Sequence, residues 1–160
     1  MRAIKSLLEV RIERLIAAPP SRVYRAWLEP ELLRRWLSPG AMEVSRVEVD
    51  ERVGGHFRIW QTQNGRDAGG FECRLIELVP DERIVLSWGF VGPQRSKGPT
   101  FDSLLTITLQ AAPGNTTILT LLHERLDDLE RAMPDVAGHV GVGWELVFDK
   151  LATLLDRAQR

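Results

Sequence analysis

The sequence predicts an α+β domain in which a curved antiparallel β-sheet of about seven strands wraps around a long C-terminal α-helix. Three observations predict it. Between residues 7 and 124, several segments alternate apolar and polar side chains, which is the period of a half-buried strand. Short turns rich in glycine, asparagine and proline separate most of these segments, and such turns join antiparallel neighbours. From Val140 onward apolar residues recur every three or four positions, as in an amphipathic helix.

The first elements are a strand and two short helices. Residues 7–16 alternate apolar and charged side chains and predict a strand. Residues 20–29 carry apolar side chains at helical spacing, and Pro30 ends that helix because the residue before a proline avoids the helical conformation. A second helix is predicted over residues 30–36, and Ser38-Pro39-Gly40 ends it.

Six more strands are predicted between Met42 and Glu124. The dipeptide Asn64-Gly65 is typical of a tight hairpin turn, because both residues accept a positive φ angle. Val91 to Thr100 is predicted to be a loop. The other strand boundaries are the turns at Val53-Gly54-Gly55, Pro80-Asp81-Glu82 and Pro113-Gly114-Asn115.

The last helix is the only element long enough to cover the apolar face of the sheet, so we expect it to lie across that face. Gly141 and Gly143 fall near its start, and glycine is costly inside a helix. Several alternatives follow. The helix begins only after Gly141 or packs tightly on a strand there, or the glycines let the helix bend or let a ligand approach the backbone. The acidic segment from Asp127 to Ala137 is predicted to be a loop at the mouth of a pocket.

Composition limits the class of protein. The 160 residues fit a single domain over residues 1–160, with a core over about 8–157. The formal net charge of −1 gives no electrostatic reason to expect nucleic acid as a partner. We expect no membrane insertion, because no window reaches the roughly 18 apolar residues of a membrane span. Cys73 is the single cysteine, which fits a reducing compartment, and we expect a cytoplasmic protein without a signal peptide.

Several segments, taken in order, resemble one known family. The chain is similar to the activator of Hsp90 ATPase homologue-like family, within the START-like superfamily (SRPBCC, birch-pollen-allergen-like) with the helix-grip fold. The resemblance covers about residues 8–155. The segments that carry it are Ile16-Ala17-Ala18-Pro19-Pro20-Ser21-Arg22-Val23-Tyr24-Arg25-Ala26-Trp27, Pro30-Glu31-Leu32-Leu33-Arg34-Arg35-Trp36, Val53-Gly54-Gly55-His56-Phe57-Arg58, Arg83-Ile84-Val85-Leu86-Ser87-Trp88, Leu119-Thr120-Leu121-Leu122-His123 and Gly143-Trp144-Glu145.

The resemblance implies a fold more sharply than an activity. The superfamily includes lipid and polyketide binders, cyclases, a chaperone co-factor domain and a toxin-sequestering resistance protein, and one fold can host several functions. Hsp90 itself is not expected as a partner. The co-chaperones that stimulate it resemble this chain only in their C-terminal part, and their separate N-terminal Hsp90-binding domain has no counterpart in these 160 residues.

A helix laid over a curved sheet encloses a space, and apolar cavities with a few polar groups are the usual ligand sites. The same inward residues could instead simply fill a core. The predicted ligand-binding residues share the inner face of the sheet, the inner face of the last helix or one end of the space between them. They are Trp36, Phe57, Ile59, Phe71, Cys73, Leu86, Trp88, Phe90, Leu105, Leu121, His123, Val140, Trp144 and Phe148.

His123 is the candidate catalytic residue, because a histidine on the inner face could bind a ligand carbonyl or move a proton. It could equally be a core histidine with satisfied hydrogen bonds. A Ser-His-Asp arrangement could be drawn from Ser103 or Ser87 with His123 and Asp102, but we do not expect one, because no Gly-x-Ser-x-Gly turn is present. We expect no metal, since three scattered histidines do not suggest a site, and no cofactor.

Three functions stay open. The first is binding of a small hydrophobic ligand of lipid, polyketide or aromatic type, as a carrier or sequestering protein. The second is a cyclase or hydrolase acting on such a ligand, with His123 or Glu124 as the acid or base. The third is a chaperone-associated interaction protein, which predicts a filled core and an exposed apolar patch. The oligomeric state also stays open, with a homodimer as one alternative.

Overall fold

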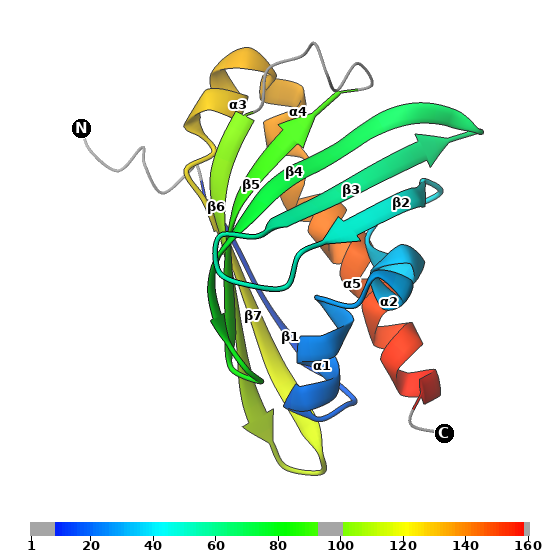
Figure 1. Ribbon diagram of the computed structural model, residues 1–160, viewed down its shortest axis with the longest axis vertical. Helices are drawn as coiled ribbons and strands as arrows, with labels where there is room; N and C mark the ends of the chain where they lie inside the picture. The colour runs from blue at the N-terminus through cyan, green and yellow to red at the C-terminus, as the bar shows by residue number, and fades with distance from the viewer. Residues whose placement is uncertain (1–8, 93–100, 159–160) are drawn as a thin grey trace.

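The structure, a computed structural model, describes residues 9–92 and 101–158, and the side chains of all of these except residues 101, 157 and 158. Within these ranges the chain forms seven strands and five helices (Figure 1). The strands are β1 (Val10–Ile16), β2 (Glu43–Val49), β3 (His56–Gln63), β4 (Arg66–Val79), β5 (Arg83–Val91), β6 (Phe101–Ala112) and β7 (Thr116–Glu124). The helices are α1 (Pro20–Ala26), α2 (Pro30–Trp36), α3 (Asp127–Ala132), α4 (Pro134–Gly138) and α5 (Val140–Ala158).

The strands make one antiparallel sheet in the order β1-β7-β6-β5-β4-β3-β2. Consecutive strands from β2 to β7 are neighbours, while β1 joins the far edge beside β7. Figure 1 shows the sheet curving around α5, which runs diagonally along its concave side. The predicted α+β architecture is therefore confirmed, including the two short helices after the first strand and the long C-terminal helix.

The pairing of strands β3 and β4 contains an irregularity. The β3–β4 register shifts between Gln61 and Thr62, which is a bulge-type irregularity. The partners there are Gly69 and Gly70, with φ angles of 93° and 150°. A Cβ atom on Gly70 would lie 1.9 Å from the carbonyl oxygen of Ile59, so no other residue fits without moving the backbone. These glycines permit the close strand approach that curves the sheet.

Helix α5 is held against both edges of the concave space. Its apolar stripe is buried, with Phe148 and Leu151 fully inaccessible. Arg14 of β1 pairs with Asp149 on α5 at 2.5 Å. Near the other edge, Lys150 Nζ donates a hydrogen bond to the carbonyl oxygen of Ser38 at 2.7 Å, just after α2. These two contacts attach α5 to β1 on one side and to the segment after α2 on the other.

Two predictions about the last third of the chain need correction. The segment from Asp127 to Ala137 is largely helical, not a loop. Acidic residues in the first turn of α3 complement the helix dipole, and Pro134 begins α4. Helix α5 begins at Val140, so Gly141 and Gly143 lie inside its first turns. The predicted loop at Val91 to Thr100 lies mostly outside the described residues, from residue 93 onward.

None of the helices within the described ranges is both long and apolar enough to span a membrane.

Candidate functional site

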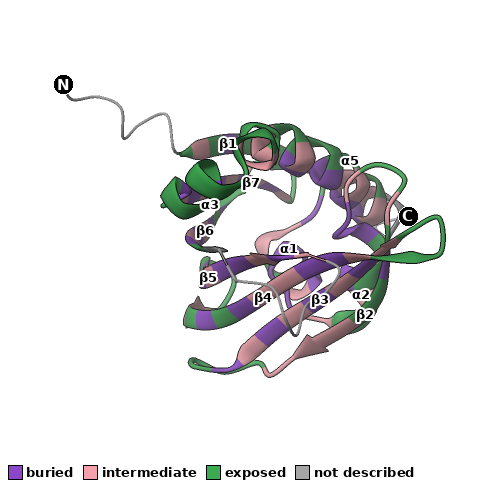
Figure 2. Cartoon of the chain, turned by 90° about the horizontal axis from the view of Figure 1, so that it is seen from above, coloured by how far each residue is buried: buried purple, intermediate pink, exposed green. Residues whose placement is uncertain are grey.

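A cavity of about 410 Å³ lies between the concave side of the sheet and helices α3, α4 and α5. Figure 2 shows buried and less buried residues alternating along β3 and β4, with α3 largely exposed above them. Among the lining residues, Trp88 and His123 of the strands and Leu129 of α3 are buried, whereas Asp135 and His139 near α4 are exposed. Its lining is Leu37, Pro39, Gln61, Phe71, Trp88, Phe90, Ser103, His123, Leu126, Leu129, Asp135, Val136, His139, Val140, Gly143, Trp144 and Val147.

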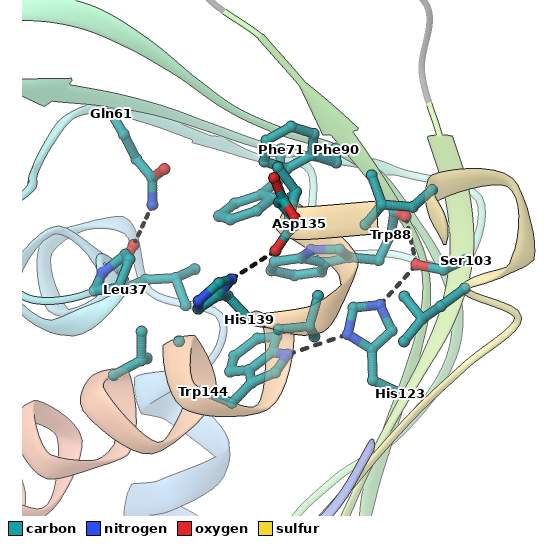
Figure 3. A pocket seen from close by; sticks show the side chains of 17 residues that line it. Leu37, Gln61, Phe71, Trp88, Phe90, Ser103, His123, Asp135, His139 and Trp144 are labelled. Atoms are coloured by element: carbon teal, nitrogen blue, oxygen red, sulfur yellow. Dashed lines mark hydrogen bonds between the residues drawn. The ribbon is translucent and has the colours of Figure 1, made fainter. Parts of the chain in front are cut away.

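Aromatic rings form one continuous side of the cavity (Figure 3). The centroids of Phe71 and Trp88 are 4.5 Å apart, and those of Trp88 and Trp144 are 5.3 Å apart. Phe90 extends the row, 6.4 Å from Phe71. Rings at these distances pack on one another and leave apolar surface toward the cavity. Such a wall suits a flat or elongated apolar molecule.

A chain of hydrogen bonds forms a buried polar part of the lining (Figure 3). Trp144 Nε1 donates to His123 Nδ1 at 3.1 Å. His123 Nε2 lies 2.6 Å from Ser103 Oγ, and that hydroxyl donates to the carbonyl oxygen of Trp88 at 2.8 Å. Ser103 and His123 are 7% and 3% exposed, so bulk water contributes little to these bonds. The network joins strands β5, β6 and β7 to helix α5.

The network fixes the protonation state of His123. An indole N–H can only donate, so Nδ1 of the imidazole must present a lone pair to Trp144. The neutral ring then carries its proton on Nε2 and donates it to Ser103 Oγ. Burial also lowers the pKa of His123 from 6.5 to about 4, because desolvation penalises the imidazolium. At neutral pH this histidine is an uncharged group with both nitrogens engaged.

The hydrogen bond between Ser103 and His123 was not predicted from the sequence. The sequence does contain the signal: counting back by two from Leu105 and Ile107 places Ser103 on the same inner face of β6. Asp102, the adjacent residue, is exposed on the opposite face of the strand. A Ser-His-Asp triad is therefore not formed. Because Nε2 already carries the proton, His123 cannot take one from Ser103 either.

Two other polar groups lie at different parts of the lining. Gln61, buried at the β3 bulge, donates from Nε2 to the carbonyl oxygen of Leu37 at 3.2 Å. His139 Nδ1 lies 2.6 Å from the carbonyl oxygen of Asp135 on the exposed rim and must donate to it. Gln61 could have been found by alternation with Phe57 and Ile59. The contributions of α3 and α4 could not, because that segment was predicted to be a loop.

The predicted ligand-binding residues fall into two groups. Six of them line the cavity: Phe71, Trp88, Phe90, His123, Val140 and Trp144. The other eight are buried in the core around it and do not contribute to its lining: Trp36, Phe57, Ile59, Cys73, Leu86, Leu105, Leu121 and Phe148. For this second group, contact with a ligand stays a prediction. The Cys73 side chain is buried.

Within the described residues, no group of three histidine, cysteine, aspartate or glutamate side chains is arranged to hold a metal ion.

Comparison with known proteins places this geometry in context. No curated protein matches the chain significantly. Among solved structures, protein CV1439 from Chromobacterium violaceum is 32% identical and superposes with a TM-score of 0.75, covering 93% of this chain and 97% of that one. Protein MLL2253 from Mesorhizobium loti is 27% identical, with a TM-score of 0.70 over 93% of this chain and 97% of that one.

A more distant structure shares the fold alone. CalU16 from Micromonospora echinospora is 24% identical, with a TM-score of 0.61 over 92% of this chain and 75% of that one.

The sequence profile of the family described as "Activator of Hsp90 ATPase homolog 1-like protein" matches residues 17–156. That match spans everything from the end of β1 to the last turns of α5. The chain belongs to the activator of Hsp90 ATPase homolog 1-like family.

Proposed function

We propose that this protein binds a small, largely apolar molecule in the cavity between the sheet and α5, as a carrier or sequestering protein of the cytoplasm. A volume of about 410 Å³ falls within the range of small-molecule sites. The aromatic row of Phe71, Trp88, Phe90 and Trp144 supplies apolar surface for a ring system. Burial of apolar ligand surface, at about 25 cal/mol per Å², is then the main source of affinity. The whole chain acts as one binding domain in this proposal.

One observation carries the choice of binding over catalysis: the buried histidine of the cavity is neutral and satisfied. A general acid or base works best when its pKa lies near the operating pH. Burial instead lowers the pKa of His123 to about 4. Both ring nitrogens are also occupied, by Trp144 and Ser103, so a proton transfer would break the network. These features favour a binding role over the cyclase or hydrolase alternative.

The chaperone-associated alternative receives less support. It predicts a filled core and a continuous exposed apolar patch. The exposed large apolar side chains among the described residues instead come from several elements, with Val142 and Leu146 as one pair on α5. Scattered residues of this kind are normal for a protein surface.

The decisive experiment is a thermal-shift and tryptophan-fluorescence screen of apolar compounds on two variants. Gly143 lines the cavity, and a Cβ atom added there meets nothing within 4 Å. Gly143→Leu therefore places a side chain in the cavity without a backbone clash. Gly138→Leu is the matched control, because Gly138 is equally free of neighbours, is exposed and does not line the cavity.

A ligand at a hundred times its dissociation constant should add about 2.7 kcal/mol to the unfolding free energy. For a domain of this size the melting temperature then rises by about 5–10 °C. We expect the shift in the unmodified protein and in Gly138→Leu, and its loss in Gly143→Leu. A ligand that shifts all three proteins equally binds elsewhere. If no apolar compound of any class shifts the unmodified protein, the cavity is not a binding site and the proposal is wrong.

A further inference from the structure

We infer that the ligand of this cavity carries a hydrogen-bond donor, a hydroxyl or N–H group that binds Ser103 Oγ, and that the cavity discriminates against carboxylates. The inference rests on the proposed function, since it names the chemistry of the ligand in the same site. It follows from the direction of each hydrogen bond in the buried network and from the charges around the cavity.

The first step is the direction of the bonds at His123. Trp144 can only donate, so it consumes the lone pair on Nδ1. The single proton of the neutral ring is then on Nε2, where Ser103 Oγ lies 2.6 Å away and accepts it. Both nitrogens are committed, so His123 offers nothing to a ligand although it lines the cavity.

The second step is the capacity left on Ser103. Its hydroxyl hydrogen is used on the carbonyl oxygen of Trp88 at 2.8 Å. One of its two lone pairs accepts from His123. The second lone pair has no partner in the described residues, and Ser103 lines the cavity. A serine hydroxyl has one donor and two acceptor sites, so the only group that can still bind here is a donor.

A ligand carbonyl or carboxylate at this point would oppose lone pair to lone pair. A hydroxyl or N–H would complete the hydrogen bonding of Ser103 and would continue the same directional chain from the ligand to Ser103 and then to Trp88. The buried network therefore acts as a recognition element for a donor.

The third step is charge. Among the described lining residues there is no lysine or arginine, and His123 is neutral. The other lining histidine, His139, lies on the exposed rim and donates its Nδ1–H to the carbonyl oxygen of Asp135. The carboxylate that does line the rim belongs to Asp135 and carries the same sign as an acidic ligand. At the other side of the cavity Gln61 donates one N–H to the carbonyl oxygen of Leu37 and keeps a second N–H and Oε1, so this amide is neutral and supplies no positive charge. A buried carboxylate without a cation is penalised strongly, so an acidic ligand loses affinity.

The test compares naphthol, its methyl ether and naphthoate by calorimetric titration at a mildly alkaline pH, where histidine side chains are neutral. These compounds share one apolar body and differ in a donor, a blocked donor and a carboxylate. We expect naphthol to bind about three- to tenfold more tightly than the methyl ether, which is the usual worth of one neutral hydrogen bond. We expect naphthoate to bind more than about tenfold more weakly than naphthol.

Two variants locate the effect. In Ser103→Ala the preference for naphthol over its methyl ether should disappear. In the control Ser87→Ala, a serine on the same sheet that does not line the cavity, the preference should persist. Because Ser103→Ala also removes partners of His123 and Trp88 and could unfold, the three-ligand comparison on the unmodified protein stands by itself.

The outcomes separate the two proposals. The inferred ligand preference is wrong if naphthol and its methyl ether bind equally, or if naphthoate binds as tightly as naphthol. If Gly143→Leu abolishes all binding in that case, the proposed binding function still stands. If none of the three compounds binds, the result counts against the proposed function itself.

Discussion

Trp144 Nε1 lies 3.1 Å from His123 Nδ1, and this hydrogen bond links helix α5 to strand β7 in the lining of the cavity. Because the indole can only donate, the contact also decides where the imidazole proton lies, and through Ser103 it decides what the cavity can recognise. A contact between two segments far apart in the sequence thus determines the tautomer of His123.

The stability of the protein should depend on pH through the protonation of His123. Its pKa falls from 6.5 in the unfolded chain to about 4 in the folded protein, because burial disfavours the charged ring. Between these values the unfolded state binds more protons, so stability is fully present above pH 6.5 and is lost as the pH falls toward 4. The full loss is on the order of 3 kcal/mol. Urea unfolding across this range measures it.

His123→Asn is the control for that measurement. An asparagine can place its Oδ1 near the position of Nδ1 and accept from Trp144, and it does not titrate. The variant should lose most of the extra acid sensitivity relative to the unmodified protein, while the contribution of surface carboxylates stays in both. Identical pH profiles of the two proteins would show that His123 does not titrate with a lowered pKa.

Trp144→Phe should destabilise the protein by about 1–3 kcal/mol, because it leaves a buried imidazole nitrogen without a donor. His123→Phe alone should have a cost of similar size, since the Trp144 N–H is then unpaired. The double variant should cost less than the sum of the two by about 1 kcal/mol, as expected for groups in direct contact. Unfolding followed by circular dichroism measures all four proteins, and strict additivity would mean that the bond contributes nothing.

Replacement of Trp27 or of Trp36 by phenylalanine should lower the stability of the protein by different amounts. Trp27 and Trp36 are both almost fully buried, and their ring centroids lie 4.8 Å apart. Trp36 Nε1 donates to the carbonyl oxygen of Ala26 at 3.0 Å, whereas Trp27 Nε1 has no hydrogen-bond partner among the described residues. Trp36→Phe should therefore cost about 1 kcal/mol more than Trp27→Phe. The denaturant midpoints of the two variants show which substitution costs more. A larger cost for Trp27→Phe would contradict the view that only Trp36 of this pair donates a hydrogen bond within the described residues.

Gly70→Ala should be severely destabilising, by about 3 kcal/mol or more. The added Cβ would lie 1.9 Å from the carbonyl oxygen of Ile59, at a φ of 150° that only glycine adopts easily. Gly92→Ala is the matched control, because a Cβ there meets nothing within 4 Å. Thermal unfolding of both variants tests the claim that Gly70 is required by the curvature of the sheet. Similar melting temperatures for the two would refute it.

The sequence by itself determined the fold, because local patterns specify local structure. The alternation along Phe57, Ile59 and Gln61 places one face of β3 inward, and Asn64-Gly65 specifies the hairpin that follows. The spacing of Trp144, Phe148, Leu151 and Leu155 identifies α5 and the face it buries. Each of these signals depends on neighbours only a few positions apart.

Only the tertiary structure decided which inward residues border a cavity and which fill the core. Phe57 and Phe71 occupy similar inward positions on adjacent strands, yet Phe71 lines the cavity and Phe57 does not. The difference depends on which segments distant in the sequence pack against each ring, and alternation contains no information about that packing. The same is true of His123 and Ser103, 20 residues apart in the chain, whose contact exists because β6 and β7 align them beneath Trp144.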